Sequence, residues 1–120
     1  MPLIKSNPIV EPADSAATTT VGTDTVTLSA TDVSGRSNYT VYVQNLGVTN
    51  AFTKGELQAS PFSTGPWAAI DTSLNTLATE TNGAIEKSNN SVAWIRFIAS
   101  STATTARAHV SFGVEQHAGA

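Results

Sequence analysis

Hydrophobic and polar residues alternate one for one near the C-terminal end of the chain. Between residues 106 and 115, single polar or small residues separate the apolar side chains of Ala106, Ala108, Val110, Phe112 and Val114. A period of two predicts a β-strand that has one face buried and the other face in water.

The same alternation occurs in two earlier segments. Residues 25–31 predict a half-buried strand whose apolar face carries Val26, Leu28 and Ala30. Residues 39–44 predict another, in which apolar or aromatic side chains at 39, 41 and 43 share one face. Turn residues follow both segments, with a glycine and two serines in 32–38 and two asparagines in 45–50.

The segment 92–99 breaks the alternation, because apolar side chains occur on both of its faces. Val92, Trp94 and Ile98 share one face, whereas 93, 95, 97 and 99 share the other, and Arg96 is the only charged residue between them. A strand that is apolar on both faces must be covered on both. A two-layer sandwich covers one face, so we expect the N-terminal segment or a neighbouring subunit to cover the other.

The middle third of the chain has a weaker pattern. It predicts a strand through residues 56–59, a loop over 60–66 (SPFSTGP) and a short strand from 67 to 70. Residues 70–79 are expected to form strand and loop, because their threonines, serine and asparagine are poor helix formers. The pair Asn82-Gly83 predicts a tight hairpin turn over 81–84, and Asn89-Asn90 predicts another turn.

Residues 1–24 are predicted to form an extended N-terminal arm. Three of the five prolines lie in this segment, and proline keeps a chain extended and out of sheet interiors. The arm also carries apolar residues that would suit contact with another subunit or protein, or with its own domain: Leu3, Ile4, Ile9 and Val10. We therefore expect an arm over 1–24, one domain over 25–116 and a C-terminal tail over 117–120.

Composition favours an all-β domain. Thr and Ser supply 31 of the 120 residues, and β-branched side chains pack better on a sheet than in a helix. The fold class predicted is a single antiparallel β-sandwich, jelly-roll or immunoglobulin-like. The net charge of -3 argues against a nucleic-acid partner, and no apolar run suggests a signal peptide or a membrane partner.

Candidate chemistry is sparse. The chain has no cysteine and no phosphate-loop, dinucleotide-binding, zinc-protease or nucleophile-elbow motif. His109 is expected on the wet face of the last strand, and the carboxylates show no spacing typical of an acid–base pair. We therefore expect no enzyme activity, no cofactor and no metal site.

Two tryptophans and one arginine are the residues most suited to recognition. Trp94 lies within the doubly apolar strand and is predicted to belong to the core or to a subunit interface. Trp67 follows the Gly-Pro loop and is either a core residue or a platform for a ligand such as a sugar. Arg96, next to Trp94, is expected to reach a sheet edge or to pair with a carboxylate.

The second half of the chain, residues 60–115, resembles small β-sandwich structural proteins from virions of tailed bacteriophages. The resemblance is carried by a loop of small residues that leads to a tryptophan, SPFSTGPW, and by a Trp-x-Arg strand, a Ser/Thr turn and an alternating last strand, WIRFIASSTATTARAHVSFGV. Glycine and proline at 65 and 66 stand where these proteins have Asp-Gly. The resemblance implies capsid decoration or a head or tail appendage, often as a homotrimer.

The predicted function is therefore non-enzymatic. In this hypothesis the protein is made in a host cytoplasm and assembles into a virion, with itself and with the major capsid protein or another virion protein as partners. The N-terminal arm and the Trp94 face would supply the contacts. The alternative is a carbohydrate-binding or fibre module that uses Trp67 as its platform.

Overall fold

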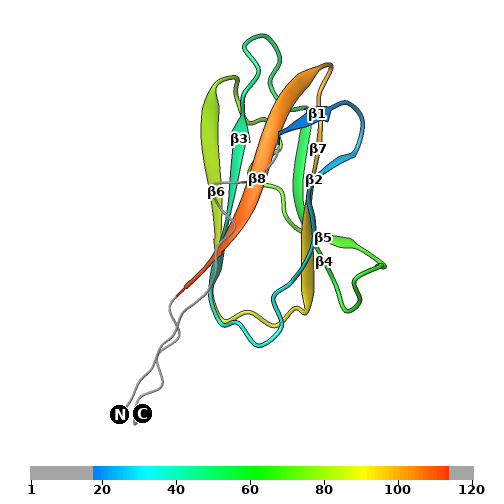
Figure 1. Cartoon of the computed structure of the whole chain (residues 1–120), viewed down its shortest axis with the longest axis vertical. Coiled ribbons are helices and arrows are strands. Elements are labelled where there is room, and N and C mark those ends of the chain that lie inside the picture. The colour runs from blue at the N-terminus through cyan, green and yellow to red at the C-terminus, as the bar shows by residue number, and fades with distance from the viewer. Residues whose placement is uncertain (1–17, 114–120) are drawn as a thin grey trace.

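The computed structural model describes residues 18–113 as two packed antiparallel sheets of four strands each (Figure 1). The strands are β1 Thr19–Val21, β2 Thr25–Asp32, β3 Tyr39–Asn45, β4 Lys54–Ser60, β5 Ala68–Asp71, β6 Thr81–Lys87, β7 Trp94–Ser100 and β8 Thr104–Phe112. No helix occurs among these residues. The prediction of a single all-β sandwich is confirmed.

The order of the strands identifies the sandwich as a jelly roll. One sheet has the order β1-β8-β3-β6 and the other β2-β7-β4-β5. Each strand of the first half pairs antiparallel with its counterpart from the second half: β1 with β8, β2 with β7, β3 with β6 and β4 with β5. The chain is therefore one long hairpin rolled into two sheets, which is the double Greek key of jelly rolls.

The core lies between the inner faces of the two sheets. Alternation in β3 and β8 brings their apolar faces inward as predicted, and Val41, Val43 and Ala106 are fully buried. The opposite sheet supplies Leu57, Ile95, Phe97 and Ala99, which are also fully buried. Phe52, from the loop before β4, completes this core.

The predicted buried face of β2 is wrong at Val26 and Ala30, whereas Leu28 packs against the core as predicted. Thr27 is buried, whereas Val26 is 41% exposed and Ala30 is exposed. The pairing of β2 with β7 shifts register twice, between Val26 and Leu28 and again between Leu28 and Thr31. Each shift breaks the period of two, and such bulges are frequent on edge strands.

The hairpin turn predicted at 81–84 is also wrong. Asn82 and Gly83 lie within β6, opposite Gln44 and Val43 of β3. A Cβ atom on Gly83 would come within 2.6 Å of the Leu74 side chain. The glycine therefore allows the Leu74 side chain to approach the sheet closely. The chain turns earlier, within residues 72–80, before β6 begins. The other predicted turn, at Asn89-Asn90, lies between β6 and β7 and is confirmed.

The predicted boundary between arm and domain needs correction. Thr19–Val21 forms β1, which pairs with β8, and Val21 is 1% exposed. The sandwich therefore includes residues that we expected in the arm, because a three-residue strand is too short to show a period in the sequence. Residues 1–17 and 114–120 lie outside the described residues, as do the predicted tail and the end of the last predicted strand.

An ion pair joins the two sheets at one side of the sandwich. Asp71 Oδ2 of β5 lies 3.2 Å from Lys87 Nζ of β6. Asp71 Oδ1 also accepts hydrogen bonds from the backbone N–H and the hydroxyl of Ser73, at 2.9 and 2.6 Å. Partial burial raises the pKa of Asp71, but the bonds from Ser73 and the nearby Lys87 outweigh it and leave this pKa below its ordinary value.

Acid is expected to remove the stability that this carboxylate contributes. A carboxyl whose pKa is lower in the folded state stabilises the fold above its unfolded pKa, and this contribution is lost as the pH falls through the folded pKa. Asp71→Asn should therefore reduce stability at about pH 7 and flatten its decline between about pH 5 and pH 2. Urea unfolding across this range measures both effects. Glu86→Gln, at an exposed carboxylate of β6, controls for the change in net charge, and equal acid sensitivity of Asp71→Asn and the wild type would contradict the prediction.

Candidate interaction surface

The outer face of the β2-β7-β4-β5 sheet brings together the residues that the sequence singled out. Trp94, Arg96 and Ile98 point away from the core, since the alternate residues of β7 are the buried ones. The register places Gln58 of β4 opposite Arg96, and Val26 of β2 opposite Ile98. We call this surface the tryptophan face, and we include in it Trp67, whose ring lies against Arg96.

Arg96 links the strands of the tryptophan face to the loop that precedes β5. Its Nε donates a hydrogen bond to Gln58 Oε1 at 2.7 Å, and its guanidinium lies 4.6 Å from the centre of the Trp67 ring. Gln58 Nε2 in turn donates to Glu56 Oε1 at 3.0 Å. Among the described residues, Arg96 therefore pairs with an amide and an aromatic ring, and not with a carboxylate, which was one of the two predicted alternatives.

Gly65 places Trp67 over the sheet. This glycine has a φ of +95°, in the left-handed region, and a Cβ atom there would come within 2.9 Å of the Trp67 indole. A side chain at 65 would therefore strain the backbone and push the indole away. The loop supplies part of the cover that the doubly apolar strand requires, and Ile98 is only 4% exposed.

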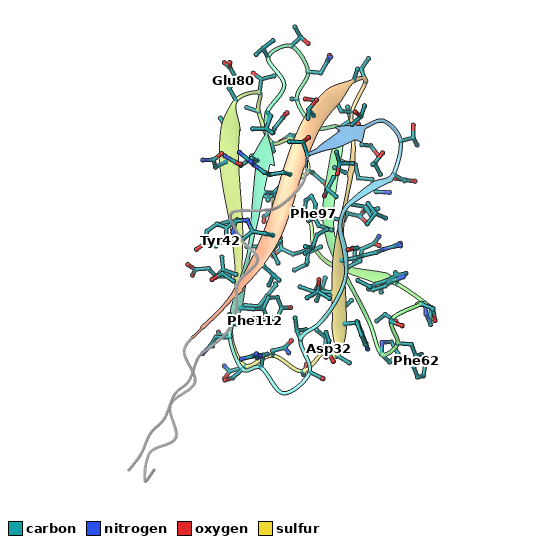
Figure 2. The ribbon with its side chains drawn as sticks, in the orientation of Figure 1. Asp32, Tyr42, Phe62, Glu80, Phe97 and Phe112 are labelled. Carbon is teal, nitrogen blue, oxygen red and sulfur yellow. The ribbon has the colours of Figure 1, made fainter. Side chains whose placement is uncertain are left out.

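Apolar side chains remain exposed where the loop 61–67 and β5 project from the body of the sandwich (Figure 1). Phe62 is 62% exposed and Ile70 is 38% exposed, and both alanines of β5 are exposed as well. Figure 2 places Phe62 at the outer end of this projection. We call residues 54–71 the β4–β5 hairpin.

A shallow apolar hollow lies at the base of the β4–β5 hairpin. Its volume is about 360 Å³, and it is lined by Ala59, Ser60, Pro61, Ser91, Val92 and Ala93. The hollow lies between the end of β4 and the segment before β7. An exposed aromatic side chain and an apolar hollow therefore lie on the same part of the molecule.

The structure unites some of the predicted site residues and adds new ones. Trp94, Arg96 and Trp67 belong to one surface, although Trp94 lies 27 positions after Trp67 along the chain. Sequence reasoning missed Phe62 and Ile70, for which the signals were a phenylalanine inside a polar loop and a short strand without a polar face. The arm residues Leu3, Ile4, Ile9 and Val10 lie outside the described residues.

The charged side chains of the described residues are scattered. Within 18–113, no three side chains of the His, Cys, Asp and Glu type come together as metal ligands. Lys54 and Asp24 form an exposed ion pair at 3.0 Å, which ties β4 to the turn before β2. None of the described segments is a helix that could cross a membrane.

Comparison with known proteins supplies no relative. No protein-family model matches the chain, and neither a curated protein nor a solved structure matches it. Function is therefore inferred from the fold and from the surfaces described above.

Proposed function

We propose that this chain is a non-enzymatic structural protein of a virion. In this proposal it decorates or cements a capsid by associating with copies of itself, as a homotrimer, and with the major capsid protein or another virion protein. The observation that carries the proposal is the β4–β5 hairpin, which presents Phe62 and Ile70 to solvent beside an apolar hollow.

The energetics of the hairpin support a role in association. Full burial of a phenylalanine side chain contributes about 1.5–3 kcal/mol, and aromatic anchors that fill pockets dominate many protein interfaces. Phe62 makes little of that contribution within its own domain, because most of its side chain is exposed. The adjoining hollow is of a size to receive an aromatic side chain from a second copy.

The virion role has two further lines of support. Residues 60–115 resemble virion proteins of tailed phages in their loop, Trp-x-Arg strand and alternating last strand. The jelly roll is also a fold of viral capsid domains, although it is shared with lectins and cupins, so this support is by analogy. The resemblance and the fold both support a role in a virion, whereas the β4–β5 hairpin supports the contact between subunits.

The alternative of a sugar platform at Trp67 has less support. A platform needs a free ring face on which a sugar can stack. The Arg96 guanidinium occupies one face of the Trp67 ring and is held there by its hydrogen bond to Gln58, so at most the other face is open to a sugar.

We expect Phe62→Ser to weaken self-association at least about tenfold, because it removes the exposed aromatic anchor. Sedimentation equilibrium of the full chain measures the oligomer and its dissociation constant, and co-sedimentation with phage capsids measures attachment. Val48→Ser is the matched control, since Val48 is 69% exposed in the loop between β3 and β4, outside the hairpin. A wild-type chain that stays monomeric at high concentration and does not bind capsids would overturn the proposal.

A further inference from the structure

The outer face of the β1-β8-β3-β6 sheet carries polar and aromatic side chains in two rows. The register aligns His109, Tyr42 and Ala84 across β8, β3 and β6 in one row. The next row, two residues along each strand, aligns Arg107, Gln44 and Asn82. All six side chains point away from the core, because their neighbours along the strands point inward.

The two rows are ordered by contacts within the sheet. The rings of Tyr42 and His109 lie 5.2 Å apart at 30°, so they form one tilted aromatic pair. Arg107 Nε donates a hydrogen bond to Gln44 Oε1 at 2.6 Å. Tyr42 nevertheless remains 42% exposed, and Figure 2 labels it on the outward side of the sheet.

A hollow of about 290 Å³ opens over these rows. It is lined by Tyr42, Val43, Gln44, Asn82, Arg107 and His109. Ala84 lies next to Tyr42 across β3 and β6, and its methyl group leaves space beside the aromatic ring. The hollow is therefore bounded by an aromatic pair at one end and by three planar polar side chains at the other.

We propose that this hollow binds a saccharide unit that carries a carboxylate, such as a uronic or sialic acid. An aromatic ring stacks on the C–H face of a sugar, and the amides of Gln44 and Asn82 suit its hydroxyl groups. A small number of polar groups around an aromatic surface is typical of small-molecule sites.

Arg107 is the residue that favours an acidic sugar over a neutral one as the ligand. The described residues place no carboxylate within ion-pair distance of Arg107, and no carboxylate lines the hollow. Its hydrogen bond to Gln44 uses Nε and leaves the two terminal nitrogens of the guanidinium to a ligand. An arginine fork of this kind matches the two oxygens of a carboxylate.

The opposite sheet contains the same pair of side chains in a different setting. Arg96 also donates through Nε to a glutamine directly across the strands, Gln58, but its guanidinium is covered by the Trp67 ring. The chain thus provides a matched control, in which the same substitution is made at an equivalent arginine on the other face.

The test is an NMR titration of the full chain with glucuronic acid and with N-acetylneuraminic acid, and with glucose as the neutral probe. We expect binding of at least one acid with a dissociation constant of about 1 mM, as suits a single sugar unit, and at least about tenfold weaker binding of glucose. Shifts should be confined to β3, β6 and β8. Tyr42→Ala and Arg107→Gln should each weaken binding at least about tenfold, whereas Arg96→Gln should leave it unchanged.

Two results would overturn the inference. One is the absence of binding to either acid by the folded wild type. The other is binding that persists in Arg107→Gln, or that falls equally in Arg96→Gln. Because the hollow and the β4–β5 hairpin belong to different sheets, the oligomeric state of each variant separates this inference from the proposed assembly role.

Discussion

Phe97→Ala is expected to destabilise the sandwich by about 4 kcal/mol, because it opens a cavity at the centre of the core. Phe97 is fully buried in β7, the strand that pairs with both β2 and β4. Its neighbours in the register are Leu28 and Leu57, and its ring lies close to the position of a Cβ atom on Gly55. Strands on both sides limit how far the site can collapse, so most of the cavity should remain.

Urea unfolding of the wild type and of Phe97→Ala measures this change in free energy. Trp67→Ala is the control, because it removes a larger aromatic side chain that packs on the outer face and not in the core. We expect Trp67→Ala to cost much less than Phe97→Ala. Similar losses in the two variants would mean that the outer face contributes as much stability as the core.

Asn45→Ala is expected to cost about 3 kcal/mol, because Asn45 is a buried polar centre at the end of β3. Its Nδ2 donates to the carbonyls of Asn50 and Leu77, at 3.1 and 3.2 Å. Its Oδ1 accepts from the backbone N–H of Gly47 and from the hydroxyl of Thr104, at 3.1 and 2.7 Å. Alanine would leave these four donors and acceptors without their hydrogen bonds to Asn45. Because Asn45 is buried, water would replace those bonds poorly.

The Asn45 prediction is checked by urea unfolding and by hydrogen exchange. Amides of the loop after β3 should lose protection, because Asn45 holds this loop to the segment before β6 and to β8. Asn82→Ala, at an exposed asparagine of β6, should change stability by less than about 0.5 kcal/mol. A loss as small as that in Asn45→Ala would show that water replaces the side chain.

The buried face of a strand was predicted correctly from the sequence where the strand pairs without a register shift. Every second residue is buried throughout β3 and from Thr104 to Val110 in β8, so the alternation predicted both strands and their inner faces. In β2 the first register shift places Val26 opposite Ile98, on the outer face, and Leu28 opposite the buried Phe97. Two residues that the alternation assigned to one face therefore lie on opposite faces. A bulge is decided by pairing with the neighbouring strand, which a single segment does not reveal.

The candidate surfaces were predictable only in part. Trp94, Arg96 and Trp67 stood out by residue type, but the contact of Arg96 with Trp67 depends on the pairing of Arg96 with Gln58 across β7 and β4 and on the bend at Gly65. The row of Arg107, Gln44 and Asn82 had no sequence signal, because its members come from three strands. The pair Asn82-Gly83 led to the wrong prediction of a hairpin turn for a similar reason. Its glycine accommodates Leu74, a residue from the preceding segment, and does not form a local turn.

The sequence by itself determined that this protein is a β-sandwich, because alternation and β-branched residues act locally, within a few residues of one strand. Tertiary structure decided which strands pair, that β1 joins the sheet, and that the chain's own loop covers part of the second face of β7. It also decided which apolar side chains remain exposed on the β4–β5 hairpin. Pairing and exposure depend on contacts between residues far apart in the chain, and a one-dimensional pattern does not record those contacts.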